Sequence, residues 1–394
     1  MSLLDFVIVL AVLIGIANGY RRGLLLSISQ YVGLVAGVVF GAAIAPAATA
    51  WIGLSDPVRR PAGAVIVLLV AGALGSALGY TVGSRLDQRQ ARGLRPSRAH
   101  SSGGALLSGL AVLSVAWFLG LTFARGPSPQ LANLIEQSAI LRQVDQVAPR
   151  PPTFLAGVER ILAGVPFPQT FAGLQPSLPA PMTIDPGAAD TPGVRSAARS
   201  TLKIEGRGCG GLVSGSGFPV AGDMVLTNAH VVAGTGGTTV TAPGTGPRRG
   251  SVVYFDPNRD VALISVANLG VAPLPTTDQG GRGTPGAVIG YPGGGPEQVS
   301  AAVIDGAVTA RGRDIYNENL VNRMIWVVEA EVQPGNSGGP LVDTNGRVLG
   351  MIFAASGSNR SQAYALTNAE IASDVQSGSS RRSAIDTRQF PCAL

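Results

Sequence analysis

Ser337 stands in the stretch QPGNSGGPLV, residues 333–342, among three glycines and two prolines. A segment of this composition makes a poor helix and a poor strand, so it is either a surface turn or a nucleophile loop. In the second case, Gly335 lets backbone N–H groups point at one spot beside the Ser337 hydroxyl. The rest of the chain has to decide, because a serine hydroxyl is a weak nucleophile unless a positioned base takes its proton.

Two histidines, His100 and His230, are the possible bases for this serine. His100 falls in a connection between apolar segments that is predicted below to be cytoplasmic. His230 stands in VLTNAHVV, residues 225–232, just after an apolar run and a turn. If Ser337 has a base outside the membrane, His230 is therefore the only candidate, provided that the predicted topology is right.

An acid that orients the base completes such a set. The stretch DPNRDVALISV, residues 256–266, puts Asp260 at the start of an apolar strand, where a buried carboxylate could meet an imidazole. Asp256 is the nearby competitor, but Pro257 follows it, which is typical of a turn residue. A single Asp at a strand edge is more often a turn cap; the order His, Asp, Ser beside predicted strands favours catalysis.

The C-terminal half reads as an all-β domain. After Val194, short apolar runs alternate with Gly, Pro and Asn turns. Such spacing predicts a sandwich or barrel, and the length from residue 194 to 394 suits one double barrel. The runs predicted to be strands are 212–213, 225–226, 238–241, 252–255, 261–266, 287–289, 324–328 and 348–353.

Three segments of this half, TNAHVV, DVALISV and GNSGGPLV, resemble the signature segments of trypsin-like serine proteases in their bacterial HtrA-type form, and GYPGG at 290–294 does so too. The resemblance covers about residues 198–370. It implies two perpendicular six-stranded β-barrels with the active site between them. It also implies that His230 is the general base, Asp260 its orienting carboxylate and Ser337 the nucleophile. The backbone N–H groups of Gly335 and Ser337 would form the oxyanion hole.

The N-terminal part reads as a membrane domain. A mean hydropathy of +0.31 with 13% charged residues is too apolar for a soluble protein of this size. Four apolar stretches account for the excess: 3–17, 24–48, 62–84 and 104–124. The last three reach the roughly 20 residues that cross a bilayer, whereas the first is short and contains Asp5. A signal peptide is the competing interpretation, but the first 20 residues have no basic region at their start.

Arginines in the connections predict the orientation of these spans. Arg21 and Arg22 follow the first span, and five arginines lie between the third and fourth, at 85, 89, 92, 95 and 98; only Arg59 and Arg60 lie between the second and third. By the positive-inside rule, the N-terminus and everything after Arg125 lie outside the cytoplasm. The net charge of +6 is explained in the same way, so no nucleic-acid partner is predicted.

Glycines recur every four residues in the second and third spans: Gly33, Gly37 and Gly41, then Gly75, Gly79 and Gly83. Small residues at this spacing let helix backbones pack closely in a bilayer. The four-span pattern and glycine content resemble the colicin V production (CvpA-type) membrane family. No acid, lysine or histidine sits mid-span, which disfavours a proton relay or a transporter core.

Residues 126–193 are predicted to link a transmembrane domain, residues 1–125, to a protease domain, residues 194–394. A helix over 130–147 would lie against the membrane, pack on the protease or space the two halves. The Pro-rich stretch 176–192 predicts an extended tether with little structure, exposed to proteolytic nicking and a possible site of self-cleavage.

Cys209 and Cys392 are the only cysteines. They show no CxxC spacing and no histidine cluster, so neither a metal site nor a cofactor is predicted. They are two unrelated buried thiols or, in an extracytoplasmic domain, a single disulfide. A bridge would anchor the C-terminal tail, and its reduction would loosen the site and act as a switch.

Together these features predict a multi-pass inner-membrane serine endopeptidase that cuts proteins or peptides of the periplasm or cell envelope. The architecture resembles a family of actinobacterial membrane-anchored serine proteases associated with acid resistance. The alternatives are a membrane scaffold or sensor whose barrel domain binds peptides without cutting them, and a transport role for the helices. Glu331 lies near the specificity pocket or faces solvent; substrate, signal and oligomeric state stay open.

Overall fold

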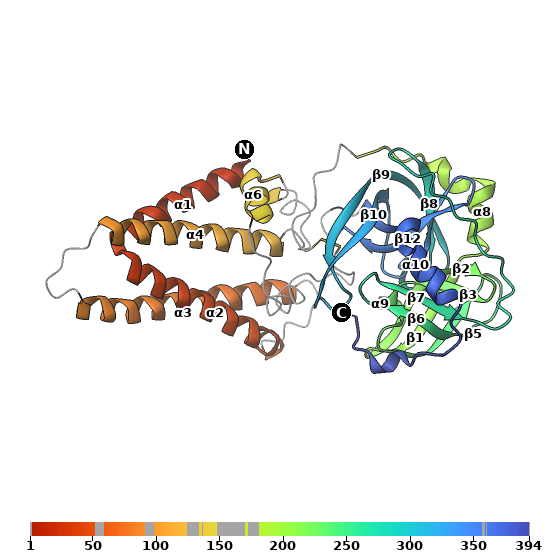
Figure 1. Ribbon diagram of the computed structural model, residues 1–394, viewed down its shortest axis with the longest axis horizontal. Coiled ribbons are helices and arrows are strands. Elements are labelled where there is room, and N and C mark those ends of the chain that lie inside the picture. The colour runs from red at the N-terminus through yellow and green to blue at the C-terminus, as the bar shows by residue number, and fades with distance from the viewer. Residues whose placement is uncertain are drawn as a thin grey trace. The chain divides into compact units, whose positions relative to one another are not determined.

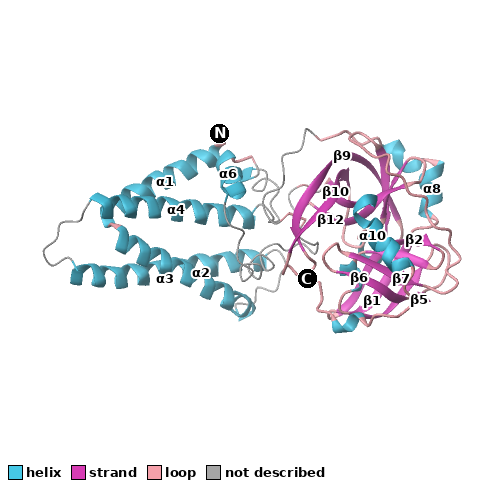
Figure 2. Ribbon diagram, in the orientation of Figure 1, coloured by secondary structure: helices cyan, strands magenta, loops and turns pink. Residues whose placement is uncertain are grey.

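The computed structural model describes residues 2–51, 59–90, 98–123, 134–135, 137–147, 170–171, 181–356, 359 and 361–393. The chain divides into two units, Met1–Val165 and Pro166–Leu394, and each is described by itself. The described part of the first unit is helical, and the second is built mainly of strands (Figure 2). This division matches the predicted multi-domain fold class of membrane helices followed by an all-β domain.

The described part of the helical unit contains four long helices and one short one (Figure 1): α1 Leu3–Arg22, α2 Leu24–Trp51, α3 Arg59–Gln90, α4 Arg98–Phe123 and α6 Ala139–Val147. The four long helices are long and apolar enough to cross a membrane. The first predicted span was drawn too short, because α1 continues through the two arginines that were expected to follow it. His100 also differs from the prediction, since it lies in the first turn of α4 and not in a connection.

Helices α2 and α3 are in backbone contact along their glycines, as predicted. A methyl group on Gly33 would collide with the Gly75 carbonyl oxygen, and a methyl group on Gly75 would collide with the Gly33 carbonyl oxygen. One turn further, a methyl group on Gly37 would meet the carbonyl oxygen of Ala71. The glycines therefore allow a close approach that any larger side chain would prevent.

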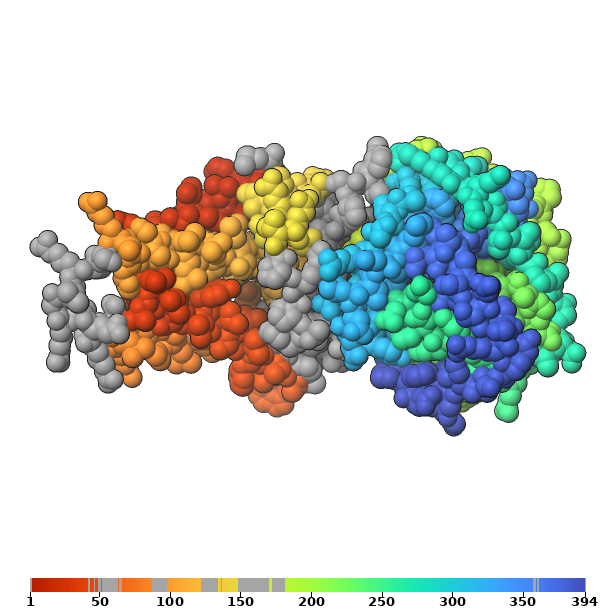
Figure 3. All heavy atoms as spheres, in the orientation of Figure 1, coloured from red at the N-terminus to blue at the C-terminus, as the bar shows by residue number. Residues whose placement is uncertain are grey.

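Helix α6 packs against α1 and α4 of the helical unit, a contact that was not among the three positions predicted for this segment. Asp5 of α1 accepts a hydrogen bond from the Ser138 hydroxyl at 2.6 Å, just before α6 begins. Near the other end, the Trp117 indole N–H of α4 donates to Asp145 at 2.9 Å. Figure 3 shows α6 in yellow against the red α1 and the orange α4. The structure confirms the helix predicted over 130–147 for its last nine residues.

Two short helices precede the strands in the described part of the β unit, η1 Pro186–Asp190 and α8 Pro192–Ala198. They correct the prediction of an unstructured tether at its C-terminal end. Asp185 and Thr191 cap these helices, whose residues Ala188 and Val194 are buried. Residues 176–180 of the predicted tether lie outside the described residues.

Seven strands form the first sheet, in the order β5-β4-β1-β2-β3-β7-β6. Their bounds are β1 Leu202–Gly208, β2 Gly211–Ala221, β3 Met224–Thr227, β4 Thr235–Thr241, β5 Arg248–Arg249, β6 Ser251–Asp256 and β7 Val261–Ser265. Six strands were expected; the seventh is β5, a two-residue extension at the edge. The buried side chains of this sheet, among them Leu202, Val225 and Ile264, form one core.

Six strands close the second sheet into a barrel, in the order β10-β13-β12-β11-β8-β9. Their bounds are β8 Pro285–Gly290, β9 Gln298–Arg313, β10 Leu320–Ala330, β11 Pro340–Asp343, β12 Val348–Ala355 and β13 Gln362–Thr367. The chain then forms α10 Asn368–Ser379 and the short η3 Thr387–Gln389. The dark blue C-terminal segment lies on the surface of the β unit (Figure 3).

Candidate active site

Strand pairing brings His230 and Asp260 together. Strand β3 ends at Thr227, and the short helix α9, Ala229–Val232, follows at once. Strand β7 begins directly after Asp260 and pairs antiparallel with β3, with Thr227 opposite Ala262. The residues after β3 therefore meet the residues before β7 at one end of the sheet, and the Asn228 side chain donates to the Asp260 carbonyl at 2.9 Å.

The carboxylate of Asp260 contacts His230 with both oxygens. One oxygen lies 2.8 Å from the imidazole Nδ1, and the other accepts the backbone N–H of His230 at 2.9 Å. Asp260 is fully buried, whereas the His230 side chain is 13% exposed. This geometry holds the ring with Nδ1 toward the acid and Nε2 away from it, as a general base requires.

The loop around Ser337 needs glycine at two described positions. Gly338 has φ +84°, and a methyl group there would collide with the Ser216 carbonyl oxygen. Gly335 has φ +102°, and a methyl group there would collide with the Tyr291 carbonyl oxygen. Both positions combine a left-handed backbone with close approach of another chain segment, so no other residue fits without strain.

The loop around Ser337 and helix α9 both lie against strand β2. The Ser216 N–H donates to the Ser337 carbonyl at 2.8 Å. A methyl group at the neighbouring Gly215 would lie 2.6 Å from the Val231 side chain and 3.2 Å from the Ser337 carbonyl oxygen. In the described part of the chain, no hydrogen bond joins His230 to Ser337, which is common in proteases without bound substrate.

The backbone N–H groups around Ser337 differ in whether the fold uses them. The N–H groups of Asn336, Gly338 and Gly339 are used within the fold, at 2.8–3.0 Å. Those of Gly335 and Ser337 have no hydrogen-bond partner among the residues that the structure describes. Two free donors flanking a nucleophile are the requirement of an oxyanion hole.

The other predicted candidates lie apart from this chemistry. Asp256 accepts the backbone N–H groups of Asn258 at 2.8 Å and Arg259 at 3.2 Å, so it is a turn residue, as expected. Glu331 follows the end of β10 and is exposed. Within the described ranges, no group of three or more His, Cys, Asp or Glu side chains could hold a metal ion.

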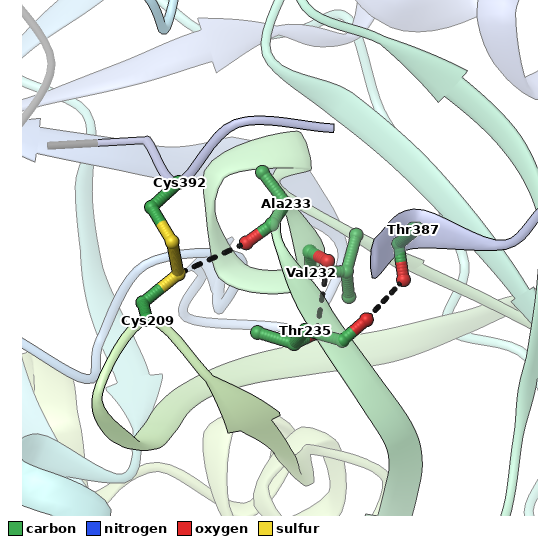
Figure 4. Close-up of a disulfide and its surroundings, with 6 residues drawn as sticks. All are labelled: Cys209, Val232, Ala233, Thr235, Thr387 and Cys392. Carbon is green, nitrogen blue, oxygen red and sulfur yellow. Dashed lines mark hydrogen bonds between the residues drawn. A yellow bond between two sulfur atoms is a disulfide. The ribbon is translucent and has the colours of Figure 1, made fainter. Parts of the chain in front are cut away.

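Cys209 and Cys392 form the predicted disulfide, with their Cα atoms 5.7 Å apart. The bridge lies where α9 ends (Figure 4): the Cys209 sulfur is 3.6 Å from the Ala233 carbonyl oxygen. A methyl group on Gly234 would lie 2.8 Å from the Cys392 sulfur. The C-terminal tail is therefore bonded to Cys209 and lies against residues 233–234, three to four residues after His230. The spacing of the cysteines gave no means to predict this placement.

Comparison with known proteins decides the family. Serine protease Rv3671c of Mycobacterium tuberculosis strain H37Rv is 32% identical over 388 residues, which cover 94% of each chain. The chain belongs to this family of serine proteases. Residues 215–351 match the trypsin-like peptidase domain, and residues 4–149 match the colicin V production protein family.

Further relatives agree with this membership. The crystal structure of the active form of the Rv3671c protease is 34% identical, with a TM-score of 0.52 over 56% of this chain and 99% of that one. A probable periplasmic serine endoprotease DegP-like of Pseudomonas putida strain W619 is 35% identical over 167 residues, 41% of this chain and 33% of that protein. The predicted family and the predicted class of enzyme, a serine protease with a membrane domain, are confirmed.

Proposed function

We propose that the chain is a membrane-anchored endopeptidase that uses His230, Asp260 and Ser337 as a catalytic triad. The observation that carries the proposal is the pair of contacts from one buried carboxylate to the ring and backbone of His230. Ser337 attacks the peptide carbonyl carbon as its proton passes to His230 Nε2, and the amine leaves with that proton. Water then releases the acyl group, with His230 taking the proton of the water.

The N–H groups of Gly335 and Ser337 complete this mechanism. Negative charge develops on the carbonyl oxygen in both half-reactions, and two fixed donors stabilise it. The glycines at 335 and 338 serve this purpose, because they allow the left-handed backbone of the loop and its close approach to neighbouring segments. One such donor contributes about 3–4 kcal/mol to the transition state of related enzymes.

The membrane domain supports a location of this chemistry at the cell envelope. Arginines after the first and third spans favour an inner-membrane protein with its protease domain in the periplasm or another extracytoplasmic space. The disulfide supports this placement, since such bonds persist in oxidising compartments. We assign residues 1–125 to the membrane domain, 126–193 to the linker and 194–394 to the protease domain. The substrates are proteins or peptides of the cell envelope. The protease acts in envelope stress or acid resistance, and it also cleaves its own tether.

Labelling with a fluorophosphonate tests the triad, using the full chain in detergent under oxidising conditions. Wild type should react, and Ser337→Ala and His230→Ala should not. The first replacement removes the hydroxyl, and the second removes the base that activates it. Ser251→Ala, at an exposed serine of β6, is the matched control and should label like wild type. Equal labelling of Ser337→Ala and wild type would disprove the assignment of the nucleophile.

The alternative is a peptide-binding scaffold or sensor, in which His230 and Ser337 would not act together; no hydrogen bond joins them within the described chain. A folded wild type that does not label, before and after cleavage in its tether, would support that alternative. Labelling that begins only after cleavage would instead establish an enzyme that is activated by processing.

A further inference from the structure

Arg323 of β10 is a cation buried within the β unit, with 1% of its surface exposed. Its Nε donates to the Asn258 carbonyl at 2.9 Å, and one terminal nitrogen, Nη2, donates to the Arg313 carbonyl at 2.9 Å. Its guanidinium carbon lies 5.8 Å from the centre of the Phe353 ring. The other terminal nitrogen, Nη1, is buried without a hydrogen-bond partner.

This cation has no acidic partner at ion-pair distance among the described residues. An unpaired buried charge is costly, so a fold retains one only where other charges or a function compensate. Burial lowers the pKa of Arg323, and the negative charge of Asp260 is the strongest influence that opposes this. The candidate triad acid is therefore the principal counter-charge of a buried arginine.

The turn that carries Asp260 needs such an anchor. Asp260 has φ +64°, a left-handed backbone that costs a non-glycine residue about 1–2 kcal/mol. The Ile315 N–H holds the turn at the Pro257 carbonyl, 3.2 Å away, and Arg323 holds it at the next carbonyl, that of Asn258. Both contacts come from the β9–β10 hairpin of the second barrel, so the barrels meet at this turn.

We propose that Arg323 is a positioning residue for catalysis: it fixes the turn that presents Asp260 and supplies the buried positive charge that stabilises the Asp260 carboxylate. The inference rests on the proposed function, because it assumes that Asp260 orients His230. Arg323 acts through Asp260 and does not touch the reacting atoms.

The charge has a measurable consequence for the pH profile of kcat/KM. On the acid limb of this profile, activity falls as the pH is lowered because the base takes up a proton. Loss of a positive charge beside the Asp260–His230 pair favours uptake of a proton by that pair, and protonated His230 cannot act as a base. The acid limb should therefore move to higher pH when Arg323 is replaced by a neutral residue. The other titratable or charged groups that surround this region stay in place: Asp256 and Arg259 on the turn, Arg313, Asp314 and Tyr316 on the hairpin, and Glu370 and Asp374 on α10.

Two replacements test the two roles of Arg323 in the full-length protein. Arg323→Gln is neutral but keeps a donor for the Asn258 carbonyl, and Arg323→Lys keeps a basic group whose charge a buried site disfavours. We expect Arg323→Gln to lower kcat/KM about 10- to 100-fold and to move the acid limb up by about one pH unit. Arg323→Lys should also lower kcat/KM, because one ammonium group does not replace the fork of donors that holds Asn258 and Arg313, and it should move the acid limb by no more than Arg323→Gln does.

Arg282→Met is the matched control, since Arg282 also donates to a backbone carbonyl, that of Asp305, and pairs with the carboxylate of the same residue at 2.8 Å. It should lower thermal stability without moving the acid limb. An unmoved limb in Arg323→Gln, with wild type active, would overturn the inference and leave the triad intact. If Arg323→Gln does not fold, an Arg323→Lys variant with the kcat/KM and the acid limb of wild type would overturn it. Wild type without serine reactivity would instead refute the proposed function.

Discussion

Asp260 binds His230 at two points, the ring Nδ1 at 2.8 Å and the backbone N–H at 2.9 Å. The second contact caps the start of α9, so one carboxylate fixes both the orientation of the ring and the helix that carries it. Removing this carboxylate therefore disturbs the base in two ways.

Asp260→Asn should lower kcat/KM about 10⁴-fold, because an amide cannot hold the imidazole in the tautomer that accepts the serine proton. Steady-state kinetics on a peptide substrate, or the rate of fluorophosphonate labelling, would measure the loss. Asp256→Asn is the control four residues earlier and should stay within a few-fold of wild type, since Asp256 caps its own turn and pairs with Arg259 at 3.7 Å but has no contact with His230 among the described interactions. Equal losses in both variants would point to a general effect of the turn.

Gly338→Ala should abolish activity and destabilise the β unit. The new methyl group would collide with the Ser216 carbonyl oxygen, at a backbone φ of +84°. Gly244→Ala is the matched control, because Gly244 has φ +70° and nothing within 4 Å of the added methyl group. Its cost should be only the backbone strain, about 1–2 kcal/mol, by thermal or urea unfolding. Similar unfolding midpoints for the two variants would show that the collision is relieved.

Loss of the disulfide should lower both stability and activity. The bridge closes a loop of 183 positions, so the entropy model gives a contribution of up to about 5 kcal/mol. Activity should fall too, because the sulfurs lie against Ala233 and Gly234, which directly follow the helix α9 that carries His230. Cys209→Ser/Cys392→Ser and reduced wild type should behave alike in unfolding and kinetic assays. Unchanged activity in Cys392→Ser would rule out a redox switch.

The stability of the β unit should depend on pH through Glu329. Burial, and then the charge of Asp305, raise the pKa of this carboxyl in the folded state, against the effect of a hydrogen bond from Gln362. The folded protein therefore holds this proton more tightly than the unfolded chain. Stability is lost as pH rises through the ordinary glutamate value of about 4.3 toward the folded value.

Glu329→Gln should thus raise the unfolding temperature relative to wild type at pH 7, and the difference should shrink at pH 4. Glu331→Gln, two residues along and exposed, is the control and should show no pH-dependent difference. Thermal unfolding of the three proteins between pH 4 and pH 8 would measure this. If wild type instead became more stable relative to Glu329→Gln as the pH rises, the pKa of Glu329 would not be raised in the folded state.

Gly75→Ala should separate α2 from α3, because its methyl group would collide with the Gly33 carbonyl oxygen. Gly72→Ala in the same helix is milder, since its methyl group would lie 3.2 Å from the Leu34 and Val38 side chains, which can move. Thermal stability of the full chain in detergent should fall more for Gly75→Ala. The reverse order would mean that the glycine contacts do not hold the two helices together.

Local patterns in the sequence predicted most of the fold. Apolar length located the four long helices, and every short apolar run predicted as a strand overlaps one. Five strands have no predicted run: β1, β5, β9, β11 and β13. In the 16-residue β9, the apolar run 301–304 is interrupted at once by Asp305 and Gly306. The structured end of the tether was also missed, because the proline at the start of η1 and of α8 looks like a breaker in sequence but is favourable in a first turn.

The candidate site was predictable where its residues lie in short motifs, as Ser337, His230 and Asp260 do. Arg323 was not, since nothing in the residues around it shows that a hairpin of the second barrel reaches a turn of the first. Contacts between residues 65 positions apart depend on the packing of the two barrels, which no local pattern encodes.

The bond between Cys209 and Cys392 also determines what a protease cut can release. A cut before Cys209, as in the tether, would free nearly the whole β unit from its anchor in one piece. A cut between the two cysteines would leave both fragments covalently joined, because the chain from 209 to 392 is a closed ring. Nicks inside the ring would therefore show as two bands only on a reducing gel, while the unit keeps its mass without reductant.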